Sequence, residues 1–145
     1  IQKRHSKLNG YYLFQRVGSL SLFKLNKMST TIVYAIPNCN TVKKALDWMK
    51  GNKQAYIFHD YKKLGITSAQ LTSWSKQVGW EALINKKGTT WKLLGPEVQA
   101  TITNQKAAIA LMAEKTSIIK RPLIEQDGKI IALGFDEAAY KKAFK

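Results

Sequence analysis

Residues 31–46 read Thr31-Ile32-Val33-Tyr34-Ala35-Ile36-Pro37-Asn38-Cys39-Asn40-Thr41-Val42-Lys43-Lys44-Ala45-Leu46. The first six residues are mostly β-branched or aromatic, which is typical of a strand. After the break at Pro37 and Asn38, apolar residues recur at helical spacing, at Val42, Ala45, Leu46 and Met49. The pattern predicts a strand at 31–36 and a helix at 40–51 that ends at Gly51, with Cys39 at the junction.

Cys39 is the only cysteine among the 145 residues. At this junction its thiol faces the free backbone N–H groups of the first helical turn, and Lys43 follows one turn later on the same side. Such surroundings favour the thiolate and attract anions. A free cysteine is also often a small buried hydrophobe, but the strand-to-helix context favours a functional thiol. Asn38 and Asn40 flank it and are candidates to cap the helix or to donate to the thiolate.

The composition indicates one soluble, strongly basic domain. The length suits a single core, and no long uncharged apolar run predicts a transmembrane helix. One cysteine excludes an internal disulfide framework and fits a reducing compartment, so we expect a cytoplasmic protein. The net charge of +15 favours anionic partners, namely oxyanions, carboxylate-bearing thiols or nucleic acid. The alternative is that this charge serves solubility alone, because the lysines are scattered along the chain.

The first 29 residues differ from the rest. Residues 1–27 contain six Lys or Arg and no acidic residue, and they show no consistent helical or strand period. We expect residues 1–29 to be a poorly structured basic extension, with Met28 as the natural start. The domain proper is expected at 30–145.

Further along the chain the pattern predicts a strand at 54–60, a polar link at 60–65 and a helix at 68–78 capped by Thr67. A short apolar segment at 80–84 and a loop at 86–90 precede helices at 96–102 and 104–114. Strands at 122–125 and 129–133 enclose a hairpin turn, and a last helix spans 136–144. The order β-α-β-helices-β-β-α predicts an α/β fold with a mixed four-stranded sheet and a helical insertion.

Four blocks of this sequence resemble the arsenate reductase (ArsC)/Spx family, most closely its YffB-like branch. They are the stretch from Tyr34 to Ala45, Phe58-His59-Asp60-Tyr61, Gly79 to Trp91, and Ile118 to Ile124 followed by Leu133-Gly134-Phe135. The resemblance implies a thioredoxin-like fold in which Cys39 attacks an oxyanion and a small thiol such as glutathione resolves the adduct. It further implies that Arg121 helps to hold the anion and that Pro122 is the cis proline beside the cysteine.

The sequence departs from the family pattern at three places. Asn85 and Gly134 stand where the resemblance implies further anion-binding arginines, although Lys86 and Lys87 follow Asn85. Val42 stands where Spx-type regulators often carry the second cysteine of a Cys-x-x-Cys pair. An intramolecular disulfide switch is therefore excluded.

The sequence thus predicts a thiol-dependent reductase in which Cys39 is the catalytic residue. The anion- or thiol-binding residues are expected to be Asn38, Asn40, Lys43, Arg121 and Pro122. Glutathione is the expected co-substrate, with no bound cofactor, no metal site and a monomeric state. The alternative is an Spx-like regulator that binds RNA polymerase without chemistry. Direct nucleic-acid binding is a weaker interpretation because no recognition motif supports it.

Four other prominent side chains are expected to have structural roles. His59 lies beside Asp60 in a predicted strand, where we expect a structural or surface position rather than a general acid. The tryptophans Trp74, Trp80 and Trp91 are expected to pack in the core and the helical insertion.

Overall fold

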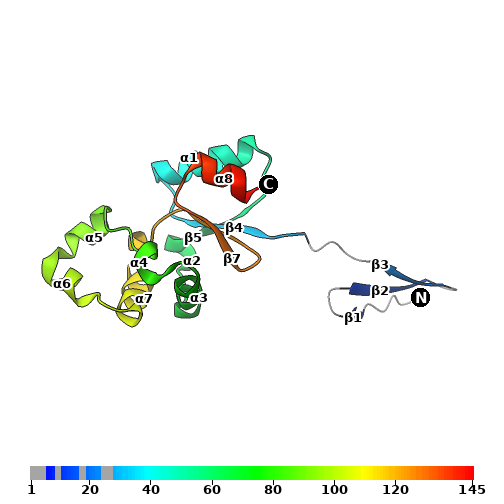
Figure 1. Cartoon of the computed structure of the whole chain (residues 1–145), viewed down its shortest axis with the longest axis horizontal. Coiled ribbons are helices and arrows are strands. Elements are labelled where there is room, and N and C mark those ends of the chain that lie inside the picture. The colour runs from blue at the N-terminus through cyan, green and yellow to red at the C-terminus, as the bar shows by residue number, and fades with distance from the viewer. Residues whose placement is uncertain (1–5, 9–10, 17–18, 24–27) are drawn as a thin grey trace.

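The computed structural model describes residues 6–8, 11–16, 19–23 and 28–145 (Figure 1). From Thr31 onward the described chain is built around one four-stranded sheet. Its strands are β4 (Thr31–Ala35), β5 (Ile57–Asp60), β6 (Leu123–Gln126) and β7 (Lys129–Leu133), in the order β5-β4-β6-β7. β4 is parallel to β5 and antiparallel to β6, which in turn is antiparallel to β7. The predicted mixed sheet and α/β fold are confirmed.

Helices cover both faces of this sheet (Figure 1). The helices α1 (Asn40–Gly51) and α8 (Glu137–Ala143) cover one face. The alternation of side chains along β4 explains the division, since Val33 and Ala35 pack with α1 and α8 while Tyr34 and Ile36 face the other core. The start of α1 is therefore held at the end of a buried strand.

The other face is covered by the helical insertion. Its elements are α2 (Tyr61–Leu64), α3 (Ser68–Val78), α4 (Trp80–Leu83), α5 (Thr89–Leu93), α6 (Gly95–Thr101), α7 (Gln105–Glu114) and the 3-10 helix η1 (Thr116–Ile118). Thr67 caps α3 as predicted, its hydroxyl accepting from the N–H of Gln70 at 3.2 Å.

Several predicted boundaries were wrong. The polar link at 60–65 is largely the short helix α2, where Asp60 accepts from the N–H of Lys62 at 2.8 Å and the Tyr61 side chain is buried. One turn of helix is too short to show a hydrophobic period, so the sequence did not reveal it. The predicted loop at 86–90 becomes helical at Thr89, and the strand predicted from residue 54 begins only at Ile57.

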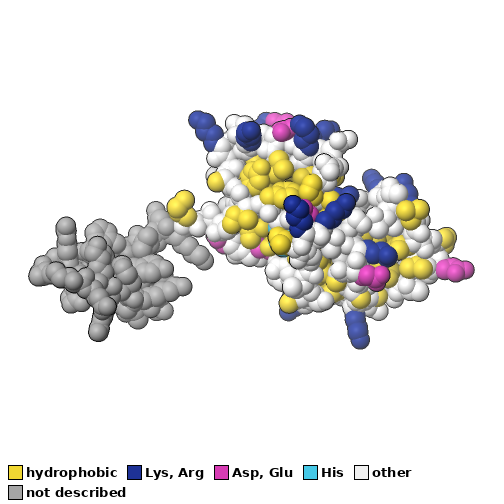
Figure 2. All heavy atoms as spheres, turned by 180° about the vertical axis from the view of Figure 1, so that it is seen from behind, with side chains coloured by type: hydrophobic (Ala, Val, Ile, Leu, Met, Phe, Trp, Pro, Cys, Tyr) yellow, Lys and Arg dark blue, Asp and Glu magenta, His cyan; other side chains and the backbone are white. Residues whose placement is uncertain are grey.

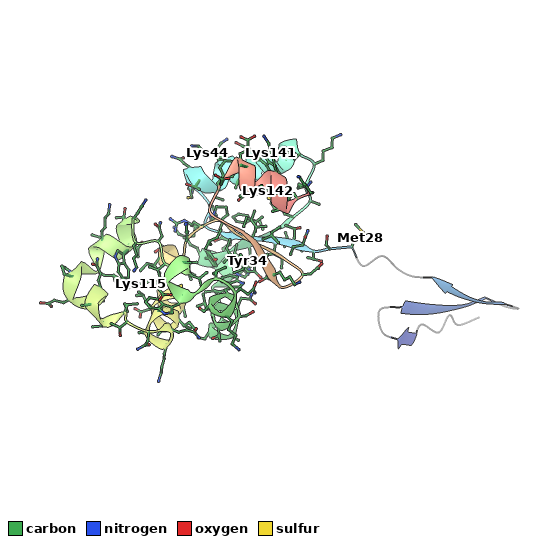
Figure 3. All side chains as sticks on the ribbon, viewed as in Figure 1. Met28, Tyr34, Lys44, Lys115, Lys141 and Lys142 are labelled. Carbon is green, nitrogen blue, oxygen red and sulfur yellow. The ribbon has the colours of Figure 1, made fainter. Side chains whose placement is uncertain are left out.

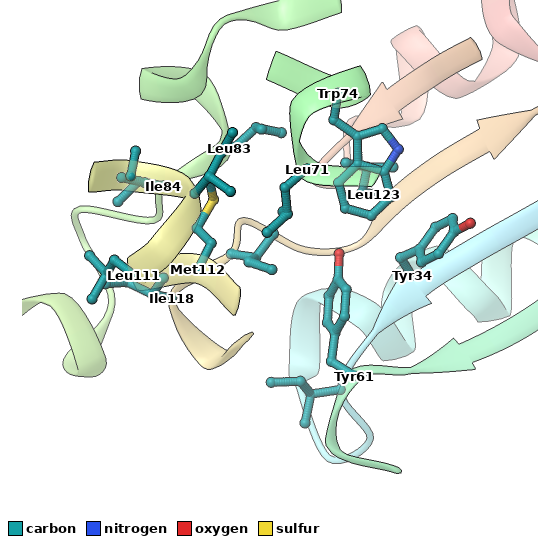
Figure 4. Packing of buried hydrophobic residues seen from close by; sticks show 14 residues of the cluster. Tyr34, Tyr61, Leu71, Trp74, Leu83, Ile84, Leu111, Met112, Ile118 and Leu123 are labelled. Carbon is teal, nitrogen blue, oxygen red and sulfur yellow. The ribbon is translucent and has the colours of Figure 1, made fainter. Parts of the chain in front are cut away.

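The core under the insertion is built of apolar side chains, among them Tyr34, Leu71 and Trp74 (Figure 4). A buried carboxylate lies against this core. Glu125 is buried and its Oε2 accepts hydrogen bonds of 2.7 Å from both Trp74 Nε1 and Gln70 Nε2. Burial, followed by the negative charge of Glu125, raises the pKa of Tyr34 to about 12. Trp74 is completely buried, and Trp80 and Trp91 pack against the same core, which confirms their structural role.

A second, small sheet lies within the N-terminal extension. It consists of β1 (Ser6–Leu8), β2 (Tyr11–Arg16) and β3 (Ser19–Phe23), all antiparallel, and among the described strands these three pair only with one another. These strands lie within residues 1–29, which we expected to be a poorly structured basic extension, and that expectation stays a prediction. β2 is rich in strand-favouring aromatic residues. Residues 1–5, 9–10, 17–18 and 24–27 lie outside the described residues, and the start at Met28 stays a prediction.

Basic side chains are spread over the described surface. On the face in Figure 2, Lys and Arg side chains stand around patches of hydrophobic atoms and do not form a single stripe. Figure 3 shows Lys44 on α1 and Lys141 and Lys142 on α8, all projecting outward. Such a surface attracts anions generally, so any specific anion site must be argued from local geometry.

Candidate active site at Cys39

Cys39 is the N-cap residue of α1, directly after the turn that leaves β4. Asn38 makes this turn with a φ of 64°, in the left-handed region that asparagine tolerates better than most residues. The extended backbone of Cys39 then starts the helix, and its carbonyl accepts from the N–H of Lys43 at 2.9 Å. At the start of α1 no side chain makes a cap hydrogen bond, so Asn38 and Asn40 do not cap it, and their donation to the thiolate stays a prediction. Cys39 itself occupies the cap position.

The surroundings of Cys39 lower the pKa of its thiol. Partial burial alone would raise the pKa, but three groups outweigh it. These are the backbone N–H of Val42, the guanidinium of Arg121 and the backbone N–H of Thr41. Cys39 is half-buried, neither sealed in the core nor fully exposed. A thiolate at this position is therefore both stabilised and accessible.

Arg121 reaches the cysteine because of the sheet topology. β6 runs antiparallel to β4 with Leu123 opposite Tyr34, so the start of β6 lies beside the end of β4. Arg121 immediately precedes β6, and its Nη1 donates to the carbonyl of Ser117 at 2.6 Å and to that of Ile119 at 3.4 Å. Its buried Nε has no hydrogen-bond partner among the described residues. The Arg121–Pro122 peptide bond is cis, as the resemblance implied.

A hollow of about 660 Å³ opens beside Cys39. We call it the Cys39 hollow; it is lined by Pro37, Asn38, Cys39, Asn40, Val42, Lys43, Leu46, Asp47, Tyr56 and Phe58. Three of the predicted binding residues, Asn38, Asn40 and Lys43, therefore lie together with the cysteine. Arg121 and Pro122 are not among the lining residues, although Arg121 acts on the pKa of the thiol.

Lys43 does not point a free charge at the cysteine. Its Nζ pairs with the Asp47 carboxylate at 2.6 Å, one turn further along α1, and both side chains are largely exposed. An exposed pair of this kind is weak, about 0.3–0.5 kcal/mol, so an anionic ligand can compete for the lysine.

Sequence reasoning missed Leu46, Asp47, Tyr56 and Phe58 as lining residues of the hollow. Tyr56 and Phe58 come from the β5 region, and only the parallel pairing of β4 with β5 brings them beside α1. The spacing of Asp47 from Lys43 was a signal that could have been used, since residues four apart share a helix face. Ser117 holds Arg121 through its backbone carbonyl, which every residue type has, so the sequence could not indicate this role.

Other singled-out residues lie in structural positions. His59 Nε2 is 2.7 Å from the carbonyl of Gly65 and its ring packs against Tyr34, which confirms the structural interpretation. Gly134 has a φ of 83°, where an arginine side chain would be strained, and the nearest atom to an added Cβ is Cε of Lys120 at 3.5 Å. The side chain of Lys120 therefore lies close to Gly134, one of the positions where the resemblance implied an arginine.

Two further features of the described residues bear on function. Residues 28–145 and the three N-terminal strands contain no helix that is both long and apolar enough to cross a membrane. Within the same residues, His, Cys, Asp and Glu side chains do not gather in groups of three that could hold a metal ion.

Comparison with known proteins places this architecture in a family. The family model described as "ArsC family" matches residues 34–143. An uncharacterized protein of Haemophilus influenzae is 42% identical over 112 residues, which cover 77% of this chain and 96% of that protein. The solved structure of the YFFB protein aligns with a TM-score of 0.75 and 39% identity over 80% of this chain and all of that chain. An arsenate reductase (ArsC) related protein from Brucella melitensis aligns with a TM-score of 0.66 and 39% identity, covering 82% of this chain and 97% of that chain. The chain is therefore a member of the ArsC family, with the thioredoxin-like fold of its relatives.

Proposed function

We propose that the chain is a thiol-dependent reductase in which the Cys39 thiolate attacks an oxidised thiol or an oxyanion. The observation that carries the proposal is the thiol at the start of α1. Its pKa is lowered and it opens onto a hollow large enough for a small molecule. Membership of the ArsC family supports the same class of chemistry.

On an oxidised thiol the reaction is two successive exchanges. The Cys39 thiolate attacks one sulfur of the substrate disulfide, a new disulfide to Cys39 forms, and the other sulfur leaves as a thiolate. A second thiol then attacks this mixed disulfide and releases Cys39. On an oxyanion, the Cys39 sulfur displaces an oxygen, which leaves as water after protonation. The second thiol attacks that sulfur, the bond from the sulfur to the central atom breaks, and the oxyanion leaves with that electron pair. The mixed disulfide that forms at Cys39 is released by a further thiol, as in the first reaction.

The second thiol must come from outside the chain. Cys39 is the only cysteine in the sequence, so an intramolecular disulfide cannot release the adduct. We propose glutathione in this role, because a basic protein surface attracts its carboxylates. Asn38, Asn40 and Lys43 border the hollow from which such a thiol would approach, and Arg121 stabilises the thiolate.

The test is to incubate the full chain with glutathione disulfide and to follow the Cys39–glutathione adduct by mass spectrometry, then its release by reduced glutathione. We expect stoichiometric adduct formation and glutathione-dependent release. Cys39→Ser should form none, and Lys142→Gln, on the outer surface of α8, should behave as the wild type. A Cys39 that stays unmodified in the folded wild type at neutral pH would refute the reductase.

The RNA-polymerase-binding alternative makes a different prediction. A regulator that only docks does not need the sulfur, so Cys39→Ser should leave polymerase capture unchanged. Finding that capture together with an unreactive Cys39 would favour the alternative.

A further inference from the structure

A second hollow continues the first one along the protein surface. It measures about 490 Å³ and is lined by Lys50, Lys53, Gln54, Ala55 and Tyr56. Tyr56 also lines the Cys39 hollow, and its side chain is 37% exposed. The two hollows therefore adjoin at Tyr56, and we call the two together the α1–β5 groove.

The groove follows one face of α1. Lys43, Asp47 and Lys50 line it and are four and then three residues apart, so they lie on the same side of the helix. Lys50 is eleven residues beyond Cys39, which corresponds to about 16 Å along a helix that rises 1.5 Å per residue. A ligand that occupies the whole groove must be long and narrow.

The chemistry changes along the groove. One end carries the reactive sulfur of Cys39. The middle is mainly apolar, and its one carboxylate, Asp47, is paired with Lys43. The far end presents the exposed ammonium groups of Lys50 and Lys53 and no acidic lining residue. The groove thus complements a ligand with sulfur at one end, an uncharged arm, and negative charge at the other end.

We propose that the α1–β5 groove binds thiols carried on a long uncharged arm that ends in phosphate, of which coenzyme A is the general example. The substrate of Cys39 is then the disulfide form of such a thiol. The arm of coenzyme A has about a dozen bonds between its sulfur and its first phosphorus. At the roughly 1.2 Å per bond of an extended polypeptide chain, it spans about 15 Å, which matches the length from Cys39 to Lys50. This inference rests on the proposed function and names its substrate class.

The exchange step is balanced without any additional group. The Cys39 thiolate attacks the sulfur whose arm lies in the groove, the substrate S–S bond breaks, and the other half leaves as a thiolate. A small thiol then attacks the mixed disulfide at Cys39 and restores the thiolate. Glutathione disulfide cannot use the far end in the same way, because its carboxylates lie about six and about eight bonds from its sulfur, well short of the arm of coenzyme A at about 1.2 Å per bond.

The experiment measures the second-order rate of Cys39 consumption in the full chain by three disulfides. Coenzyme A disulfide has the arm and the phosphates, pantethine has the same arm without phosphates, and glutathione disulfide has carboxylates on a short arm. At low ionic strength we expect coenzyme A disulfide to react at least about tenfold faster than pantethine, and the difference to shrink with added salt.

Two double variants separate the groove from the general positive charge. Lys50→Gln/Lys53→Gln should remove most of the coenzyme A preference and leave the pantethine rate unchanged. Lys92→Gln/Lys106→Gln removes the same charge from exposed positions in the helical insertion, outside the groove, and should leave the preference intact. Tyr56→Ala, at the residue that lines both hollows, should slow both long-arm disulfides.

The outcomes distinguish this inference from the proposed function. Equal rates for coenzyme A disulfide and pantethine, or equal losses in the two double variants, would overturn the inference while the reductase stands. Failure of Cys39 to react with any of the three disulfides would overturn the reductase itself.

Discussion

Arg121 Nη1 donates a hydrogen bond of 2.6 Å to the backbone carbonyl of Ser117, and this contact fixes the guanidinium beside Cys39. The arginine therefore does not have to be ordered when the thiolate forms. Its charge lowers the pKa of the thiol, and Arg121 is not among the residues that line the Cys39 hollow.

The first prediction concerns the ionisation of Cys39. Arg121→Gln removes the positive charge and should raise the pKa of the thiol, because the guanidinium is one of the groups that lower it. The measurement is the pH dependence of alkylation by iodoacetamide, whose midpoint should move to higher pH. Lys142→Gln is the matched control, and an unshifted midpoint in Arg121→Gln would contradict the electrostatic role.

The same ionisation links stability to pH. The pKa of Cys39 is lower in the folded protein than in the unfolded chain, so the thiolate stabilises the fold only above the folded-state pKa. The free energy of unfolding of the wild type, compared with that of Cys39→Ser, should therefore increase as the pH rises from the folded-state pKa to the unfolded-state pKa of Cys39. The same stability should be lost when the pH falls back through the folded-state pKa. Urea unfolding at several pH values measures this difference, and a difference independent of pH would argue against a lowered pKa.

The second prediction compares two buried tyrosine hydroxyls. The hydroxyl of Tyr61 has no hydrogen-bond partner among the described residues, whereas that of Tyr140 donates to the carbonyl of Gly134 at 2.9 Å. Tyr61→Phe should therefore keep or raise the free energy of unfolding, by up to about 1 kcal/mol, while Tyr140→Phe should lower it by about 1 kcal/mol. Thermal and urea unfolding measure both; equal losses in the two variants would mean that Tyr61 has a partner after all.

The third prediction concerns Glu125. Glu125→Leu leaves the Trp74 indole N–H and the Gln70 amide without their acceptor, and should cost about 1–3 kcal/mol for the buried indole group. Glu125→Gln keeps an acceptor oxygen and should cost less. Glu125→Gln should also lower the pKa of Tyr34 from about 12. Burial would still raise this pKa, but the negative charge of Glu125, which raises it further, would be absent. Tryptophan fluorescence during unfolding and an ultraviolet titration of tyrosinate measure the two effects. A Glu125→Leu variant as stable as the wild type would refute this role.

The fourth prediction contrasts two glycines. Gly134 has a φ of 83°, so Gly134→Ala should destabilise the fold by about 1–2 kcal/mol through backbone strain. Gly51 ends α1 without such a conformation and has no atom within 4 Å of an added Cβ. Gly51→Ala should therefore stabilise by up to about 1 kcal/mol. The opposite signs can be checked in one series of unfolding curves.

The sequence predicted β4, α1 and the position of Cys39 between them because three local signals agreed: β-branched residues, a Pro-Asn break and a helical period. α2 escaped prediction because a single turn has no period, and its buried Tyr61 looked like part of a polar link. The groove escaped it for a different reason. Tyr56 lies beside α1 only because β5 pairs with β4. The local sequence pattern predicts the helix and the strand but not which face of the helix lies next to the strand.

The helix start at Cys39 also has a consequence for engineering. Cysteine occupies the N-cap without a side-chain cap hydrogen bond, in a position where serine is among the strongest caps. At a pH where the thiol is protonated, Cys39→Ser should therefore be more stable than the wild type by about 0.5–1 kcal/mol, although it cannot react. Screening this protein for heat resistance alone would favour an inert variant, so stability and reactivity must be selected together.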